Sequence, residues 1–205
     1  MLAVDVSTPD GVDTLIESVR DLEIGVLVPC AAIECSGYFV DTPAETHARL
    51  LAMDCYGPMK LAHHFGGAMA ERRRGAILFV SSMSGWMVQP YMAHYGAAKA
   101  YIVALGEALH YEMADKGVHV SVLSPGPTDT PMAANTGIDF ASMGMAVMQP
   151  DAVAAAGLAS LGRSAHAIPS LRNQVMVLMM TRLMPRWGVG RMFRWMMGRA
   201  LGIQR

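Results

Sequence analysis

Short apolar runs alternate with longer segments of helical periodicity along this chain. The runs are rich in Val, Ile and Leu and lie at Leu2–Val4, Ile24–Val28, Ala76–Val80 and Val118–Leu123. Runs of this length are typical of strands that are buried on both faces of a sheet. The pattern therefore predicts four strands, each followed by a longer connection.

The segments between the runs repeat apolar residues every three or four positions, as amphipathic helices do. Helices are expected over Asp10–Val19, Ala44–Arg74 and His94–Lys116. Thr8 is placed as the N-cap of the first, and a break is expected near Gly57–Pro58 in the second. Strands that alternate with helices predict an α/β fold with a doubly wound parallel sheet, whose ligands bind at the carboxyl ends of the strands.

The composition fits one globular domain and argues against several other classes of protein. Of the 205 residues, 53% are hydrophobic and 16% are charged, and 16 basic residues nearly balance 17 acidic ones. The chain has no large positive net charge that would attract it to nucleic acid. No set of His, Cys and carboxylate residues has the spacing of a metal site. Cys30, Cys35 and Cys55 form no paired framework, so we expect buried free thiols and a cytoplasmic protein.

The C-terminal part of the chain departs from this balance. Residues 163–205 contain eight Arg and no other charged residue, whereas residues 1–162 carry a formal charge of −9. Arg alternates there with Met, Trp and Phe, which predicts a helical extension on a core formed by residues 1–162. A lid over the substrate, a dimer contact and a membrane-surface segment remain open for this extension. Its many Met residues favour a bulky apolar substrate.

Three residues have the spacing that proton transfer to a carbonyl oxygen needs. Tyr95 and Lys99 lie four residues apart at the start of a predicted helix, so both point from one face. A phenol has a pKa of about 10, and an adjacent ammonium lowers it by favouring the phenolate. Ser82 ends the preceding strand and can bind the same substrate oxygen. This arrangement suits hydride transfer at a carbonyl carbon while a proton moves at its oxygen.

Together, Ser82, Tyr95-x-x-x-Lys99 and Pro125-Gly-Pro-Thr-Asp-Thr130 resemble the motifs of the short-chain dehydrogenase/reductase family. The likeness extends from Asp5 to about Met132. It implies a Rossmann-like fold, NAD or NADP as cofactor, a small-molecule carbonyl or alcohol as substrate, and a homodimer or homotetramer. Tyr95 would be the acid/base, Lys99 would bind the nicotinamide ribose, and Ser82 would orient the substrate carbonyl.

The resemblance also assigns residues to the cofactor site. They are Asp5 and Val6 at the adenine, Ala31 and Ala32 where the backbone can come close to the cofactor, Pro125 and Gly126 at the nicotinamide, and Thr128 or Thr130 at the carboxamide. A helix N-cap ahead of a proline is the alternative role for the two threonines.

Two departures from the family pattern bear on the site. Pro29-Cys30-Ala31-Ala32 stands where the family has Asn-Asn-Ala-Gly, which removes two side-chain amides. Asp54 stands where the family has a catalytic-site Asn, so the proton relay would keep its geometry and gain a charge near Lys99.

The largest departure is the lack of the Thr-Gly-x-x-x-Gly-x-Gly turn that binds the cofactor pyrophosphate. The chain begins at what resembles the third strand of the family, so the first βαβ unit, with strands 1 and 2, is not represented. We expect either a truncated gene product or a mis-assigned start codon. In both cases Leu2–Val4 either pairs beside Ile24–Val28 or leaves an open sheet edge. A non-catalytic remnant or interaction module that cannot hold the dinucleotide is the alternative function.

Overall fold

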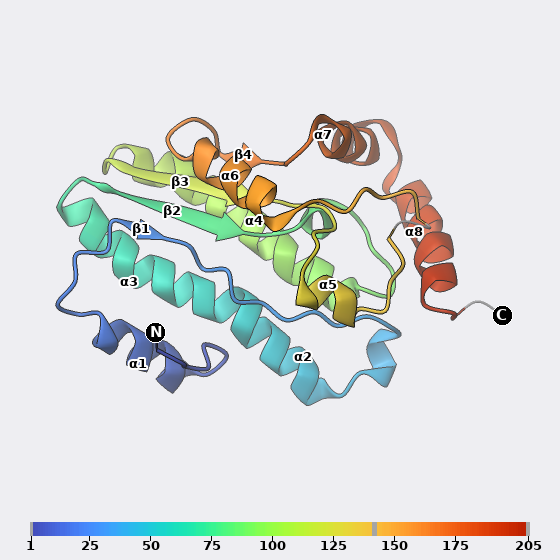
Figure 1. The fold of residues 1–205 in the computed structure, drawn as a ribbon, viewed down its shortest axis with the longest axis horizontal. Helices are drawn as coiled ribbons and strands as arrows, with labels where there is room; N and C mark the ends of the chain where they lie inside the picture. The colour runs from blue at the N-terminus through green and yellow to red at the C-terminus, as the bar shows by residue number, and fades with distance from the viewer. Residues whose placement is uncertain (1, 141–142, 204–205) are drawn as a thin grey trace.

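The computed structural model describes residues 2–140 and 143–203, which form an α/β layered fold around a parallel sheet (Figure 1). The strands lie in the order β1-β2-β3-β4, and every adjacent pair is parallel. Their bounds are Val26–Leu27 for β1, Gly75–Val80 for β2, Val118–Leu123 for β3 and His166–Ala167 for β4. The predicted fold class is confirmed, and two of the four predicted strands match β2 and β3 almost residue for residue.

Helices cover both faces of this sheet. Figure 1 shows α1 and α3 below it and α6 above it. The helix bounds are Pro9–Ser18 (α1), Ala44–Leu51 (α2), Gly57–Glu71 (α3), Ala93–Ala114 (α4), Pro131–Asn135 (α5), Pro150–Ser160 (α6), Leu171–Leu178 (α7) and Arg186–Ala200 (α8).

Side chains of each strand point alternately to the two faces of the sheet, so the core has a part on each face. Ile77 and Phe79 of β2 are buried in the cluster that contains α1, α3 and α4, whereas Leu78 lies with Val153 of α6 on the other face. Successive side chains of a strand point to opposite faces, so a strand covered on both sides is apolar throughout. This explains why β2 appears in the sequence as an uninterrupted apolar run.

The N-terminal residues do not form the strand that the sequence predicted. Residues 2–5 have no strand geometry, and β1 is the last strand at that edge of the sheet. A strand needs a hydrogen-bonded neighbour, and no segment of the described chain supplies one between residues 2–5 and β1. The open-edge alternative is therefore the one observed, with Leu2 50% and Val26 51% exposed.

The second predicted helix is continuous rather than broken near Gly57–Pro58. Between α2 and α3, residues 52–56 form a π-helical turn, in which the Gly57 N–H donates to the Ala52 carbonyl. Proline lacks an N–H and its ring crowds the preceding turn, and a widened turn accommodates both. The expected N-cap of α1 is confirmed, because the Thr8 side chain accepts a hydrogen bond from the Gly11 N–H.

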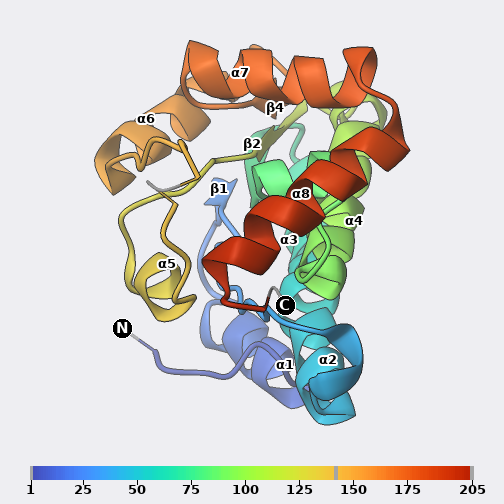
Figure 2. The same ribbon diagram turned by 90° about the vertical axis from the view of Figure 1, so that its right-hand side faces the viewer.

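The C-terminal extension is packed onto the rest of the fold. It contributes β4, which pairs with β3, and the helices α7 and α8. The inner face of α8 buries Val189, Phe193 and Met197 in a second core cluster that also holds Tyr95. Figure 2 shows α8 crossing the end of the molecule with α7 above it. In the described ranges, no helix combines the length and the hydrophobicity that crossing a bilayer needs.

The three cysteines are free, as predicted, but they differ in burial. Cys55 is buried and Cys35 is half-buried, whereas Cys30 is exposed. The prediction of a buried thiol is therefore wrong for Cys30, which follows β1 at the uncovered edge of the sheet.

Candidate active site

The polar residues that follow β2 and β3 meet at one edge of the sheet. Ser82 lies two residues after the end of β2 and caps the short 3-10 turn of residues 83–86. Its Oγ accepts a hydrogen bond from the Ser84 N–H at 3.1 Å. The Met83 N–H donates to the Pro125 carbonyl at 2.9 Å. This bond joins the two strand ends, because the carboxyl ends of parallel strands lie side by side.

Tyr95 and Lys99 enter this edge from the first turns of α4. Both are buried, with 9% and 4% exposure, and the Lys99 Nζ lies 5.5 Å from the centre of the Tyr95 ring. The Tyr95 hydroxyl is hydrogen-bonded to the Ser82 side chain. A Cβ on Gly85 would lie 2.7 Å from the Lys99 carbonyl group, so only glycine lets the 83–86 turn pack this closely on α4. The structure thus brings together the three residues that the spacing predicted.

Burial controls the protonation of Tyr95. Removal from water raises the pKa of the phenol, and the lowering effects of Lys99 and of the Ser82 hydrogen bond do not outweigh it. The sequence argument predicted a lowered pKa from Lys99 alone, and this prediction is wrong because it left burial out. Tyr95 is therefore a neutral phenol, a proton donor, at neutral pH.

Asp54 lies in the π-helical turn and is paired with the lysine. Its Oδ2 lies 3.0 Å from the Lys99 Nζ, and its Oδ1 accepts the Ile33 N–H at 2.8 Å. Burial raises the pKa of the Asp54 carboxyl, while Lys99 and the Ile33 N–H lower it. The Lys99 ammonium also lies 3.4 Å from the Val80 carbonyl. The predicted charge beside Lys99 is thus a direct ion pair.

The residues assigned to the nicotinamide pocket lie next to this group. Pro125 and Gly126 follow β3, and a Cβ on Gly126 would lie 2.9 Å from the Asn173 Nδ2 and 3.0 Å from the Met83 Sδ. Asn173 belongs to α7 and is 4% exposed. Gly126 therefore lets the loop after β3 pack closely between the turn after β2 and the C-terminal extension.

The two threonines have separate roles. The Thr130 Oγ1 caps α5 by accepting the Ala133 N–H at 3.3 Å, which is the alternative that the sequence left open for it. The Thr128 Oγ1 donates to the Gly126 carbonyl at 3.0 Å. Thr128 lies within the same loop as Gly126, and its contact with a carboxamide stays a prediction.

The remaining predicted cofactor residues lie along the N-terminal segments. Asp5 accepts hydrogen bonds from the Ser7 N–H at 2.9 Å and the Ser7 hydroxyl at 2.6 Å, and the serine lowers the pKa of this carboxyl. Val6 packs against the core beside α1 and α3. Ala31 and Ala32 follow β1 and lead directly to the backbone that contacts Asp54.

The sequence analysis missed Glu34. Its Oε1 is buried without a hydrogen-bond partner among the described residues, and burial raises the pKa of this carboxyl. Its charge also raises the pKa values of Cys35 and Tyr95, so it belongs to the same electrostatic environment. Glu34 is the one charged residue between Glu23 and Asp41, which is the signal that would have identified it.

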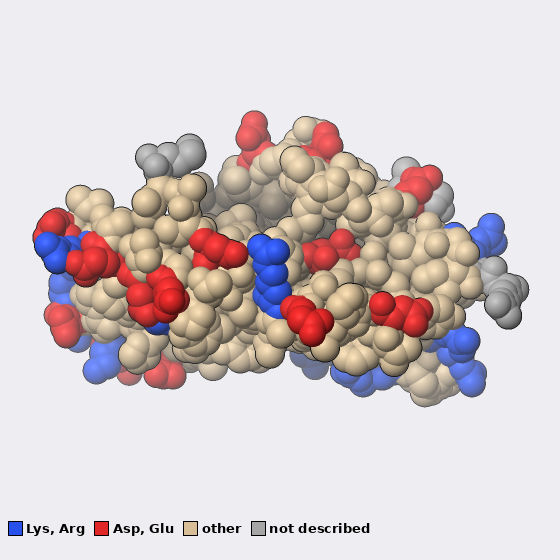
Figure 3. Space-filling model, turned by 90° about the horizontal axis from the view of Figure 1, so that it is seen from below, with Lys and Arg blue, Asp and Glu red and all other residues tan. Residues whose placement is uncertain are grey.

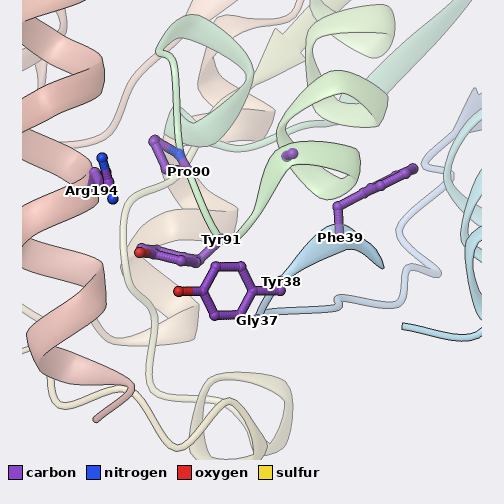
Figure 4. A pocket seen from close by; sticks show the side chains of 7 residues that line it. Gly37, Tyr38, Phe39, Pro90, Tyr91 and Arg194 are labelled. Atoms are coloured by element: carbon purple, nitrogen blue, oxygen red, sulfur yellow. The ribbon is translucent and has the colours of Figure 1, made fainter. Parts of the chain in front are cut away.

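An open cleft of about 290 Å³ lies between the start of α4 and α8 (Figure 4). It is lined by Gly37, Tyr38, Phe39, Pro90, Tyr91, Ala93 and Arg194. Ala93 begins α4 two residues before Tyr95, and Tyr91 packs against the cluster that buries Tyr95. The cleft is therefore close to the predicted catalytic residues, although Ser82, Tyr95 and Lys99 do not line it.

Histidines near this cleft pair with each other instead of forming a metal site. The Nδ1 atoms of His47 and His94 lie 2.9 Å apart, and the His47 ring stacks on Phe39. Across residues 2–140 and 143–203, no three His, Cys, Asp or Glu side chains are grouped to hold a metal ion.

A parallel sheet between helical layers, with Ser, Tyr and Lys at its carboxyl edge, is the architecture of a nucleotide-dependent oxidoreductase. The sequence model of the family described as short chain dehydrogenase matches residues 1–139. The chain belongs to this family.

Relatives and solved structures agree with this assignment. A 7beta-hydroxysteroid dehydrogenase from Clostridium sardiniense is 32% identical over 163 residues, which cover 80% of this chain and 62% of that protein. The chain thus spans less than two thirds of that relative. A solved 7beta-hydroxysteroid dehydrogenase superposes with a TM-score of 0.85 at 28% identity, covering 94% of this chain and 75% of that one. A short-chain dehydrogenase from Sphingobium yanoikuyae, solved with NADPH, gives a TM-score of 0.75 at 28% identity. The match covers 84% of this chain and 70% of that one.

Proposed function

We propose that this chain is the catalytic part of an NAD- or NADP-dependent oxidoreductase that interconverts a carbonyl group and a secondary alcohol. The observation that carries the proposal is the hydrogen bond between Tyr95 and Ser82, with Lys99 one helical turn further along α4. Burying a hydroxyl pair and an ion pair costs free energy even when they are well partnered, which favours a catalytic role over the non-catalytic alternative.

The nicotinamide end of a dinucleotide fits the residues present. The Lys99 ammonium is buried beside Tyr95, and Gly126 has no side chain that would crowd the backbone next to this group. The reduced cofactor, when bound, would supply the hydride, and the oxidised cofactor would accept it in the reverse direction. Pro125, Gly126 and Thr128 would line its nicotinamide, and Asp5, Val6, Ala31 and Ala32 are the proposed contacts toward its other end. The pyrophosphate-binding glycine turn of the family is not among the 205 residues.

In the reductive direction the chain moves one proton. The Ser82 hydroxyl donates a hydrogen bond to the substrate carbonyl and holds its oxygen beside the Tyr95 hydroxyl. As the carbonyl carbon is reduced, the O–H bond of Tyr95 breaks and the new alcohol O–H bond forms. The resulting phenolate lies near the Lys99 ammonium, whose charge stabilises it, and a proton from solvent restores the phenol.

We further propose that the substrate is a bulky apolar ketone or alcohol. Tyr95 lies in a cluster rich in methionine, which comprises Met83, Met87, Met92 and Met197 with the partly buried Met143, Met176, Met180, Met184 and Met192. Unbranched, polarizable side chains can repack around a large apolar ligand. The relatives that act on hydroxysteroids support this choice. The inner face of residues 163–205 would then form one wall of the substrate site.

The outer face of the same extension is proposed to contact an anionic membrane surface. Leu178, Leu183 and Trp187 are 56%, 67% and 67% exposed around the bend between α7 and α8. The guanidinium of Arg191 lies 5.2 Å from the centre of the Trp187 ring. Exposed Trp and Leu among Arg are typical of interfacial helices. Lys, Arg, Asp and Glu are instead interspersed on the face of α1 to α3 (Figure 3).

Two further parts of the proposal rest on general grounds. The three free cysteines favour a reducing, cytoplasmic location. We propose a homodimer or homotetramer, because these assemblies are common in the family. Residues 1–162 and 163–205 are proposed as the core and the extension of one catalytic unit.

Titration of the 205-residue chain with NADH and NADPH tests the function directly, with nicotinamide fluorescence and thermal shift as readouts. Saturable binding below about 1 mM, which corresponds to about −4 kcal/mol, is expected. The Lys99→Met variant should lose this binding, whereas Lys116→Met, at an exposed position two residues after α4, should keep it. A folded chain that binds neither cofactor would support the non-catalytic alternative.

A further inference from the structure

The cleft beside the catalytic group combines an apolar aromatic lining with one cation. Tyr38, Phe39, Pro90 and Tyr91 supply the walls, and Arg194 of α8 is the one charged residue among them. The rings of Tyr38 and Tyr91 meet edge to face, with centres 5.2 Å apart. This lining suits a ligand that is mostly apolar and has a polar group at one end.

The polar groups of the cleft converge on one place. Figure 4 shows the hydroxyl groups of Tyr38 and Tyr91 directed toward the helix that carries Arg194. The pKa of Tyr38 is raised, mainly by its hydrogen bond to the Tyr91 hydroxyl, while the positive charge of Arg194 acts on the same hydroxyl in the opposite direction. One hydroxyl proton of this pair and the guanidinium N–H groups remain as hydrogen-bond donors to an oxyanion.

Arg194 has no acidic partner in the part of the chain that the structure describes. The other arginines of the outer face of α8 stack on tryptophan rings, Arg191 on Trp187 and Arg199 on Trp195. Arg194 instead faces the cleft, where its charge is available to a ligand.

The backbone at Tyr91 is strained in a way that fixes this geometry. Tyr91 has a φ of 69°, in the left-handed region that aromatic residues rarely adopt, and its carbonyl accepts the Gly37 N–H at 2.8 Å. Strain of this kind persists where the surrounding structure holds it and clusters at ligand sites. The bond to Gly37 holds the segments that carry the two tyrosines together.

From these observations we infer that Arg194, Tyr38 and Tyr91 form a subsite for an anionic group, a carboxylate or sulfate, at the far end of the apolar substrate. This inference rests on the proposed function and narrows its substrate class to anionic amphipathic ketones. The apolar body would lie along the methionine-rich cluster between the cleft and Tyr95, and the oxyanion would accept hydrogen bonds from the guanidinium and from one hydroxyl of the tyrosine pair.

Binding measured without turnover tests this subsite. The probes are a steroid ketone with a side-chain carboxylate and its methyl ester, titrated into the full chain by calorimetry or thermal shift. We expect the acid to bind about 10-fold more tightly than the ester, because charge-assisted hydrogen bonds are the stronger ones. Arg194→Gln should remove this preference and leave ester binding unchanged.

Arg191→Gln is the matched control, since it removes the same charge from the same helix but at a side chain that stacks on Trp187. It should keep the preference for the acid, and Tyr38→Phe should reduce it partly. Equal loss in both arginine variants, or equal binding of acid and ester by the native chain, would overturn the subsite while leaving the ketone reductase standing. If neither probe binds, the bulky apolar ketone itself is wrong and the subsite fails with it.

Discussion

The Asp54 carboxylate lies 3.0 Å from the Lys99 ammonium, and the two side chains are 0% and 4% exposed. The pair places a negative charge next to the lysine that would stabilise the Tyr95 phenolate. Asp54 raises the pKa of Tyr95 by its charge, whereas Lys99 lowers it. The charge of Asp54 therefore favours the protonated form of Tyr95.

Replacement of Asp54 by Asn should move the pH profile of alcohol oxidation to lower pH. Oxidation needs the Tyr95 phenolate, and removing the Asp54 charge removes one cause of the raised tyrosine pKa. The measurement is kcat/KM for oxidation against pH. An unchanged profile would show that the carboxylate does not act on Tyr95, and Asp21→Asn, at an exposed site, serves as the control.

Removing the Asp54 side chain beyond Cβ should lower the stability of the fold strongly. Asp54→Ala leaves the Lys99 ammonium and the Ile33 N–H buried without their partner, which costs about 3–5 kcal/mol for a broken buried pair. Chemical denaturation measures the loss in unfolding free energy. Asp54→Asn keeps the acceptor for Ile33 and should lose less, so equal losses in the two variants would contradict this account of the contact.

The reductive reaction should have a flat pH dependence from about pH 6 to pH 9. Tyr95 acts there as a proton donor, and its pKa is raised above the ordinary value of about 10 by burial. Reduction is lost only as pH rises through that pKa. A decline of kcat/KM beginning near pH 7 would mean that another group, not Tyr95, supplies the proton.

Tyr95→Phe should abolish turnover while the chain stays folded. The phenyl ring keeps the buried contacts of the tyrosine, and only the hydroxyl bound to Ser82 is lost. Turnover and thermal unfolding should be compared with those of Tyr111→Phe, which removes a hydroxyl from an exposed position on the same helix. Substantial activity in the Tyr95 variant would remove this residue from the mechanism.

Binding to anionic vesicles should depend on the outer face of the C-terminal helices. Arg182→Gln and Arg186→Gln should each weaken binding about fivefold, since a basic residue near an anionic surface contributes about 1 kcal/mol. Flotation with anionic and zwitterionic vesicles, at low and at about 1 M salt, measures this. Arg20→Gln on α1 should have no effect.

Point substitutions are the better probe here, because deletion of residues 186–205 would also remove Val189, Phe193 and Met197 from the core. Vesicle binding that is unchanged in both arginine variants would leave the extension as a wall of the substrate site alone.

Two glycines within helices should respond to alanine in opposite directions. In α4, a Cβ on Gly106 would lie 2.3 Å from the Val122 side chain and 3.1 Å from Phe79, so Gly106→Ala should destabilise the chain by about 1–3 kcal/mol. In α3, Gly67 has open space, and Gly67→Ala should stabilise by about 0.5–1 kcal/mol through helix propensity. Denaturant unfolding distinguishes the two, and a stabilised Gly106 variant would contradict the packing of α4 on β3.

The sequence by itself determined the features that depend only on residues close to each other along the chain. Apolar runs at 76–80 and 118–123 became β2 and β3, Thr8 capped α1, and the spacing of Tyr95 and Lys99 placed both on one face of a helix. These features follow from periodicity and capping chemistry, which act over a few residues. Ser82 could be added because parallel strands place their carboxyl ends at one edge.

Only the tertiary structure decided the features that depend on distant neighbours. Residues 2–4 have the composition of a strand but lie without a partner, and His166–Ala167 became β4 because β3 offered one. The raised pKa of Tyr95 depends on burial by residues from α7 and α8, which no local pattern predicts. Arg194 looks like any other arginine of a basic helix in the sequence, and its place in the cleft was set by the packing of α8 across the end of the fold.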